Sequence, residues 1–301
     1  MKPIRLFPVV FTAICAAAVT LYAAAEPKNM KKTAIVTQAA TLPHRLSLAP
    51  TTKHTSVATE HAASTPNLIN RPKSTITEPA TGMELMAVPG GCYQMGDNGG
   101  DADEKPVHQV CLDSFYIGKH EVTQGQWLQI MGTTPAFFSF CGNDCPVENV
   151  SWNDVQEFIS KLNRLNSGGY RLMTEAEWEY ACRSGGKSER FCGGDDVGAV
   201  AWYDRNSSSK PHQGGEQQSN GLGLFDMSGN VWEWVSDLYQ NDYYATTQGR
   251  NPVGALTGPK RVMRGGSWYN DHKNVRASIR GSLEPGYRSI NLGFRMAYSI
   301  R

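Results

Sequence analysis

The sequence predicts a globular domain of the α+β class that has little regular secondary structure and is stapled by disulfides. Hydrophobic residues make up 40% of the 301 residues, which is enough for a buried core. The 30 glycines and 16 prolines favour a fold rich in turns over a helical bundle. Of the seven cysteines, Cys15 lies in an apolar N-terminal run, and an even number remains for pairing.

The first 25 residues are typical of a cleaved secretory signal. Lys2 and Arg5 precede an apolar run at residues 6–22, and three alanines at residues 23–25 provide the small side chains that a signal peptidase requires. We therefore expect a periplasmic or secreted protein that meets a membrane only during export. The apolar run is just long enough to leave an uncleaved membrane anchor as the alternative.

Residues 26–82 are predicted to be a disordered linker. This segment is dominated by Thr, Ala, Ser, Pro and Lys and contains no aromatic residue, so it cannot bury a core. It serves either as a tether that holds the domain away from a membrane or partner, or simply as a solvated spacer. Residues 1–82 carry a net charge of +6 and residues 83–301 a net charge of −5, and the total of +1 argues against nucleic acid as a partner.

Residues 83–301 are expected to form one domain, which begins with two strands and a short helix. Residues 90–96 and 115–122 are predicted to be strands, because apolar or aromatic side chains recur there with a period of two. Thr123 is expected to cap the helix that follows, and Gly132 to end it.

Two further helices are predicted from their N-terminal caps. The helix after Ser151 carries apolar residues at every third or fourth position, which is typical of a helix with one buried face. The helix after Thr174 begins with a capping box, in which Glu177 reaches back to the cap residue. After Arg183 about ninety residues show little periodicity, so we expect buried tryptophans and a hard cation to hold them in place.

In an oxidising compartment the remaining six cysteines are expected to form disulfides. Fifteen pairings are possible, and proximity in the sequence favours Cys92 with Cys111, Cys141 with Cys145, and Cys182 with Cys192. Metal binding by Cys141 and Cys145 is the alternative, although neither a second close pair nor a histidine cluster completes four ligands.

Several motifs occur together in a fixed order. They are VPGG (88–91), MG (95–96), YIGK (116–119), EVT (121–123), PVENVSW (146–152), RLMTEAEWE (171–179), GLFDMSGNVWEW (223–234), RGGSW (264–268) and NLGFR (291–295). In this order they resemble the formylglycine-generating enzyme family, also called sulfatase-modifying factors, over residues 83–297. The resemblance implies a variant of the C-type lectin fold.

The resemblance also implies a structural calcium ion. Its ligands would be the side chains of Asp226 and Glu233 and the backbone carbonyls of Gly229 and Val231. Carboxylates and carbonyls are the ligands that a hard cation prefers. The alternative is that both carboxylates bond only to backbone amides.

Copper is not expected. Family members that oxidise a cysteine to formylglycine bind copper(I) through two cysteines that follow the Gly-Gly-Ser element, and this sequence has Asn270 and Val275 at those positions. Soft thiolates are the fitting ligands for copper(I), and neither an amide nor an isopropyl group replaces them.

The resemblance implies that residues 269–290 form a ligand-facing surface for an unidentified protein, peptide or small molecule. The candidate ligand-binding residues are Trp268, Tyr269, Asn270, Asp271, His272, Arg276, Arg280, Tyr287 and Arg288. Tyrosine and arginine are common at binding hot spots. The alternative is that Arg276, Arg280 and Arg295 only pair with carboxylates of the domain.

The sequence therefore favours an exported binding or accessory protein that has lost the copper pair. One alternative is an oxidoreductase of the same family with non-cysteine chemistry, similar to the relatives implicated in siderophore maturation, for which Ser267, His272 and Glu284 are the candidate catalytic residues. The other is a genuine formylglycine-generating oxidase.

Overall fold

The computed structural model describes residues 73–166, 168–247 and 249–300. The predicted signal peptide and most of the predicted linker lie outside these residues. The linker was predicted to extend to residue 82, and this boundary is wrong, because strand β1 (Thr75–Thr77) pairs antiparallel with β2 (Glu84–Val88). Glu78 is fully buried in the turn between them and accepts hydrogen bonds from the backbone of Ala80 and Thr81.

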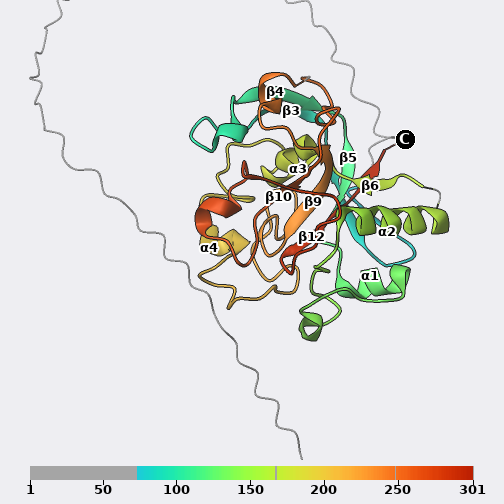
Figure 1. Ribbon diagram of the computed structural model, residues 1–301. Helices are drawn as coiled ribbons and strands as arrows, with labels where there is room; N and C mark the ends of the chain where they lie inside the picture. Colours follow the sequence, from blue (N-terminus) through green and yellow to red (C-terminus); the bar gives the residue numbers. More distant parts are fainter. Residues whose placement is uncertain (1–72, 167, 248, 301) are drawn as a thin grey trace, which may run out of the picture. The chain divides into compact units, whose positions relative to one another are not determined.

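The first sheet brings the two ends of the domain together. Its strand order is β1-β2-β5-β13-β6, with β5 at Phe115–Gly118, β13 at Met296–Ser299 and β6 at Tyr170–Leu172. Helices α1 (Gln124–Met131) and α2 (Trp152–Leu165) pack against each other, and α2 also contacts β6 (Figure 1).

The second sheet has the order β11-β10-β9-β12 and forms the centre of the domain. Its strands are β9 (Trp232–Leu238), β10 (Arg261–Arg264), β11 (Arg280–Leu283) and β12 (Leu292–Phe294), and β12 runs parallel to β9. Two smaller pairs complete the strands, namely β3 (Gly91–Met95) with β4 (His108–Leu112) and β7 (Ala201–Trp202) with β8 (Ser228–Gly229).

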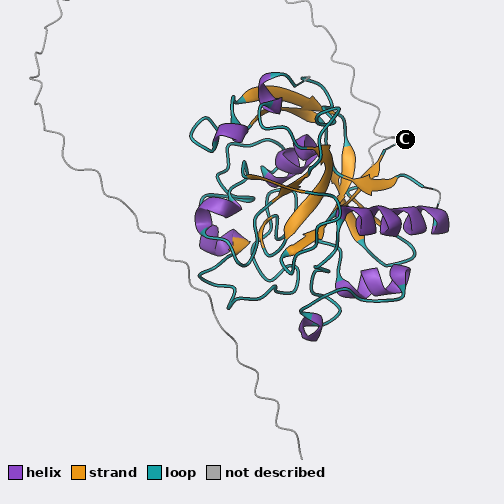
Figure 2. Ribbon diagram, in the orientation of Figure 1, coloured by secondary structure: helices purple, strands orange, loops and turns teal. Residues whose placement is uncertain are grey.

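The rest of the domain consists of loops and short helices, as Figure 2 shows. These helices are α3 (Glu175–Cys182), α4 (Val197–Val200), η2 (Ala102–Glu104), η3 (Ser139–Cys141), η4 (Tyr243–Ala245) and η5 (His272–Val275). None of the helices in the described part of the chain is both long and apolar enough to cross a membrane.

The three helices predicted from their caps are confirmed. The side chains of Thr123, Ser151 and Thr174 each accept a hydrogen bond from the backbone three residues later, and α1 ends at Gly132 in the left-handed conformation. The two predicted strands are also found, although β5 ends at Gly118, four residues before the predicted end.

The prediction that the chain is irregular for about ninety residues after Arg183 is wrong in part, because β9 and β10 lie in this stretch. In β9, residues 232–235 are all buried. A central strand that is covered on both faces shows no alternation of apolar and polar residues, so the period-two pattern was absent.

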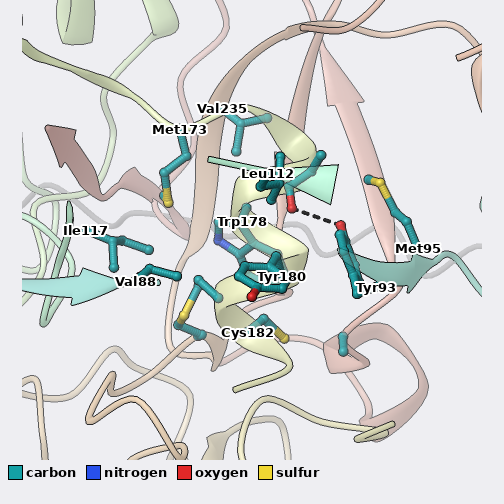
Figure 3. Close-up of a cluster of buried hydrophobic side chains, with 14 of the residues drawn as sticks. Val88, Tyr93, Met95, Leu112, Ile117, Met173, Trp178, Tyr180, Cys182 and Val235 are labelled. Atoms are coloured by element: carbon teal, nitrogen blue, oxygen red, sulfur yellow. Dashed lines mark hydrogen bonds between the residues drawn. The ribbon is translucent and has the colours of Figure 1, made fainter. Parts of the chain in front are cut away.

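Helix α3 is at the centre of one of the two main hydrophobic clusters. All eight of its residues are buried, and Figure 3 shows Trp178 surrounded by side chains of the cluster. The Tyr93 hydroxyl donates to the carbonyl oxygen of Ala176 over 2.8 Å. The helix therefore also buries its three acidic residues. Glu177 pairs with the partly exposed Arg171, whereas Glu175 and Glu179 require partners in the core.

Buried arginines provide these partners. Arg280 donates to both oxygens of Glu175 over 2.7 and 2.9 Å, and Arg264 donates to Glu179 over 2.6 Å. The guanidinium of Arg264 also donates to the carbonyl oxygens of residues 277, 278 and 279. Residues 277–279 precede strand β11, so their carbonyl oxygens are not paired within a sheet, and the contacts with Arg264 provide their hydrogen bonds.

Candidate functional site

The three predicted disulfides are confirmed. Cys92 is bonded to Cys111, Cys141 to Cys145 and Cys182 to Cys192. The alternative of a metal site at Cys141 and Cys145 is therefore wrong, since their sulfur atoms are joined to each other. All six cysteines in the described residues are used in this way, so none of them is a free thiol.

The Gly-Gly-Ser element leads into a hydrogen-bonded network at the end of β10. Adding a Cβ atom to Gly266 would place it 2.1 Å from the carbonyl oxygen of Asn274, so only glycine allows the chain to turn this tightly. The buried Ser267 hydroxyl then donates to Asn270 Oδ1 over 2.7 Å and accepts from Asn291 Nδ2 over 2.9 Å. Trp232 Nε1 donates to the same Asn270 oxygen over 2.9 Å.

The residues at the two copper positions have structural roles. Asn270 accepts the hydrogen bonds from Ser267 and Trp232 and, through its backbone oxygen, a third from the amide of Asp204. Val275 is fully buried and packs in a cluster with Phe191 and other apolar residues. Neither side chain is therefore a soft metal ligand.

Only some of the predicted ligand-binding residues are exposed to solvent. Tyr269 and Tyr287 are exposed, at 72% and 52%, whereas Trp268 is buried. Asp271 caps η5 by accepting from the backbone amides of residues 273 and 274. His272 is half-buried in η5, and its side chain makes no hydrogen bond within the described residues.

The arginines in this segment pair with carboxylates, which was the predicted alternative. Arg280 is buried against Glu175, so its assignment to a ligand-facing surface is wrong. Arg276 makes a bidentate pair with Glu104 over 2.7 and 2.8 Å. Arg288 is exposed but pairs with Asp154 at the start of α2. Arg295 is the third arginine that the alternative named, and it is buried and bonded to Glu233.

Exposed aromatic rings collect on one part of this region, which we call the aromatic surface and define as Phe137, Phe140 and Tyr269. These side chains are 62%, 74% and 72% exposed. They lie against the buried rings of Phe138 and Trp268, with centroid separations of 5.1 to 5.7 Å and edge-on geometry. The sequence motifs did not indicate the phenylalanines, although three of them within four residues, next to a disulfide, are a readable signal.

A polar pocket of about 300 Å³ adjoins the aromatic surface. Phe140, Lys210, His212 and Glu216 are among its lining residues. The His212 ring stacks on Trp202 at 3.8 Å, and its Nδ1 atom lies 3.4 Å from the Glu216 carboxylate. The pocket thus places charged and hydrogen-bonding groups beside exposed apolar rings, which is the usual composition of a ligand site.

The predicted calcium ligands lie in a buried acidic cluster. Glu233 Oε1 accepts two hydrogen bonds from Arg295, and its Oε2 atom accepts one from Trp178. Asp226 Oδ2 accepts from the amide of Gly215, whereas its Oδ1 atom is buried without a hydrogen-bond partner in the described residues. Glu121 is also buried, and its carboxylate accepts from Asn230 Nδ2 and from the amide of Val231, so Glu233 is the one of the three carboxylates that hydrogen bonds to Arg295.

This cluster concentrates negative charge in the core, and Asp226 Oδ1 is the oxygen atom in it that is buried without a hydrogen-bond partner in the described residues. Burial raises the pKa of Glu121, and it raises that of Asp226 to about 6, because the single guanidinium does not offset three buried negative charges. The described residues contain no group of three or more His, Cys, Asp or Glu side chains arranged to hold a metal. The predicted calcium ion would thus have two carboxylate ligands, Asp226 and Glu233, and would depend on the backbone carbonyls of Gly229 and Val231 for the rest of its coordination.

We expect calcium to stabilise the protein. An ion that binds only the folded state raises the free energy of unfolding by about 2.7 kcal/mol when its concentration is 100 times its dissociation constant. Thermal unfolding followed by circular dichroism should show a lower Tm after chelation with EGTA, and added calcium should restore it. The Asp226→Ala variant should lose this response, and an identical wild-type Tm with and without chelator would contradict the site.

Comparison with known proteins agrees with this structure. The family model of the sulfatase-modifying factor enzyme 1-like domain matches residues 72–300. The chain is 31% identical to the formylglycine-generating enzyme of Streptomyces coelicolor over 78% of this chain and 93% of that protein. It is 30% identical to the chaperone protein LppX of Paenibacillus barcinonensis over 72% of this chain and 89% of that protein.

A solved structure shows the same fold. Treponema denticola variable protein 1 superposes with a TM-score of 0.68 at 29% identity, over 74% of this chain and 98% of that chain. The predicted α+β fold, a formylglycine-generating-enzyme-like variant of the C-type lectin fold, is therefore confirmed. The chain belongs to the family of the sulfatase-modifying factor enzyme 1-like domain.

Proposed function

We propose that this protein is an exported member of its family that binds a ligand at the aromatic surface and does not carry out copper-dependent cysteine oxidation. The observation that carries the proposal is the pair of residues at the copper positions, Asn270 and Val275, one committed to a hydrogen-bonded network and the other to a hydrophobic cluster. The ligand is an unidentified protein, peptide or small molecule. Three disulfides support export to an oxidising compartment.

The aromatic surface is suited to recognition because it is exposed and also rigid. The Cys141–Cys145 disulfide closes the turn that follows Phe140. The buried carboxylate of Glu148 accepts a hydrogen bond from the amide of Phe138 over 2.7 Å, which holds the middle of the loop. Rigid aromatic side chains contribute contact area while losing little conformational entropy on binding.

The contacts of Ser267 favour binding over non-cysteine catalysis. Its hydroxyl bonds to the amide side chains of Asn270 and Asn291, and in the described residues no histidine or carboxylate hydrogen bonds to it. A serine nucleophile needs an adjacent base within hydrogen-bond reach. The other two catalytic candidates, His272 and Glu284, make no hydrogen bond to Ser267 that would assemble such a pair.

A direct assay tests the loss of copper chemistry. The purified protein is incubated with copper(I), oxygen and a peptide that carries a sulfatase cysteine motif, and mass spectrometry then measures conversion of the cysteine to an aldehyde. We expect no aldehyde above the level without protein, because the two thiolate ligands are missing.

The formylglycine-generating enzyme of Streptomyces coelicolor, assayed in parallel, serves as the positive control. Aldehyde formation by the wild-type protein at a rate comparable to that control would refute the proposal. The Asn270→Cys/Val275→Cys double variant provides a second test, which measures copper(I) binding. It should gain copper(I) affinity in competition with a chromogenic chelator if these two positions correspond to the family's metal ligands.

A further inference from the structure

A large cavity of the domain lies apart from the aromatic surface. It is a cleft of about 1180 Å³ between the β3–β4 hairpin, the loop at residues 96–101, the segment at residues 183–195 and the stretch at residues 273–278. None of the three residues of the aromatic surface lines it. Its size is that of a site for an extended ligand.

Two paired arginines hold the walls of the cleft in place. Arg183 donates to Glu179, to the carbonyl oxygen of Glu189 and to that of Gly96, so it joins two of the bordering segments. Arg276 donates to both oxygens of the buried Glu104 and thereby joins the 96–104 region to the end of η5. The cleft is therefore preformed and does not need to be ordered by its ligand.

Three other cations in the lining have no such partner. Lys187, Arg190 and Lys273 line the same cleft, and none of them forms an ion pair with a carboxylate in the described residues. Arg190 only stacks over the ring of Phe191, at 5.4 Å from its centroid. These three positive charges are available to a ligand.

Most carboxylates that line the cleft already have hydrogen-bond or ion-pair partners, unlike these three cations. Asp97 accepts from the amide of Gly99 and lies 3.5 Å from Arg276, Glu189 accepts from the Ser184 hydroxyl, and Asp195 accepts from the amide of Arg190. At Asp101 the backbone forms the contacts: its amide donates to Glu104 Oε1 over 3.1 Å, and its carbonyl oxygen accepts from the amide of Glu104. An anionic ligand can therefore pair with the free cations, while these fixed carboxylates exclude a chain with continuous negative charge.

The hairpin contributes two free amide side chains. Gln94 and Gln109 are directly opposite each other across β3 and β4, both are exposed, and neither side chain makes a hydrogen bond in the described residues. A carboxamide offers donors and an acceptor in one plane, which suits the neighbouring hydroxyl groups of a sugar. Tyr93 and Val107 are the large apolar residues of the lining, and the Tyr93 ring is only 4% exposed.

We propose that this cleft binds an acidic oligosaccharide, a short sugar chain whose carboxylate groups are separated by neutral, hydroxyl-bearing units. The free cations take the carboxylates, and the paired glutamines take hydroxyl groups. A peptide is the less suitable occupant because the cleft offers few exposed apolar anchors. A nucleic acid is excluded by the fixed carboxylates, which oppose its closely spaced phosphates.

Isothermal titration calorimetry with three probes tests the proposal. They are a hyaluronan tetrasaccharide, in which carboxylate-bearing and neutral sugars alternate, chitotetraose as a neutral chain of the same length, and tetraglutamate as an acidic peptide. We expect the hyaluronan tetrasaccharide to bind at least about tenfold more tightly than the other two, with an affinity that falls as salt is added.

Variants locate the site. Lys187 and Lys273 are exposed and unpaired, so the Lys187→Gln/Lys273→Gln double variant should keep the wild-type Tm while its affinity for hyaluronan tetrasaccharide falls by about tenfold. Lys187→Arg should retain the affinity. The matched control is Lys260→Gln, which removes an exposed lysine that lines neither this cleft nor the pocket beside the aromatic surface, and the affinity for the hyaluronan tetrasaccharide should not change.

Four results would overturn the proposal. These are equal affinity for hyaluronan tetrasaccharide and chitotetraose, tighter binding of tetraglutamate, unchanged affinity in the double lysine variant, and no binding of the acidic sugar at about millimolar concentration. None of these results bears on copper chemistry or on the aromatic surface, so this proposal fails or stands separately from the proposed function.

Discussion

Replacing Arg264 with methionine is expected to lower the free energy of unfolding by about 3 to 5 kcal/mol, which is the usual cost of removing one partner from a buried ion pair. Arg264 is fully buried and donates to Glu179 and to the carbonyl oxygens of Ala277, Ser278 and Ile279. Methionine fills similar space but leaves these acceptors with fewer donors. Urea unfolding followed by tryptophan fluorescence measures the effect as a lower midpoint at an unchanged slope.

Two further variants separate this effect from a general cost of losing an arginine. Arg250 pairs with Asp113 at the surface, where both side chains are more than 60% exposed, so Arg250→Met should cost less than about 1 kcal/mol. Arg264→Lys keeps the charge but not the planar fork of donors, and it should fall between the other two. A loss below about 1 kcal/mol for Arg264→Met would show that the buried pair does not stabilise this core.

The buried arginines also mark the limit of sequence reasoning for this fold. Thr123, Ser151 and Thr174 could be identified as helix caps because a cap depends on residues only three positions apart. The pairing of Arg264 with Glu179 joins residues 85 positions apart, and no local pattern encodes it. A hard cation was therefore expected to organise the loops, whereas in the described residues much of this organisation comes from guanidinium groups.

The positions of the candidate site in the sequence could be predicted, but their exposure to solvent could not. The motifs located Ser267 and the two copper positions, Asn270 and Val275, because the family resemblance aligns them residue by residue. They did not indicate which residues of 269–290 face solvent, since exposure depends on packing against distant segments. Arg280 and Tyr269 illustrate this difference, because one is buried against Glu175 and the other is 72% exposed.

Glu148, which holds the loop of the aromatic surface, is expected to make the free energy of unfolding dependent on pH. Burial raises the pKa of its carboxyl from 4.5 to about 7, and hydrogen bonds from the Phe138 and Phe137 amides only partly oppose the shift. Its Oε2 atom is buried without a partner in the described residues. Because the folded state holds this proton more tightly than the unfolded state, the contribution of Glu148 is fully present below about pH 4.5 and is lost as the pH rises through about 7.

Replacing Glu148 with glutamine is expected to remove this loss. The amide stays neutral at every pH and keeps an oxygen that accepts from the Phe138 amide, so the variant should match the wild type near pH 4.5 and exceed it by up to about 3 kcal/mol at pH 8. Urea unfolding at several pH values measures the free energy of unfolding of both proteins. Subtracting the wild-type value from that of the variant removes the contributions of the other titrating groups, such as Asp237, whose pKa is also raised to about 7.

Glu148→Leu is the matched control for this experiment. Leucine is neutral too, so its stability should follow the same pH dependence as that of the glutamine variant. It removes the acceptor for the Phe138 amide, so the leucine variant should be less stable than the glutamine variant at every pH by about 1 to 3 kcal/mol. If the free energies of unfolding of the glutamine variant and the wild type instead differed by a constant amount from pH 4.5 to pH 8, the carboxyl of Glu148 would not titrate in this range. The loop that carries Phe137 and Phe140 would then keep the same stability across this pH range.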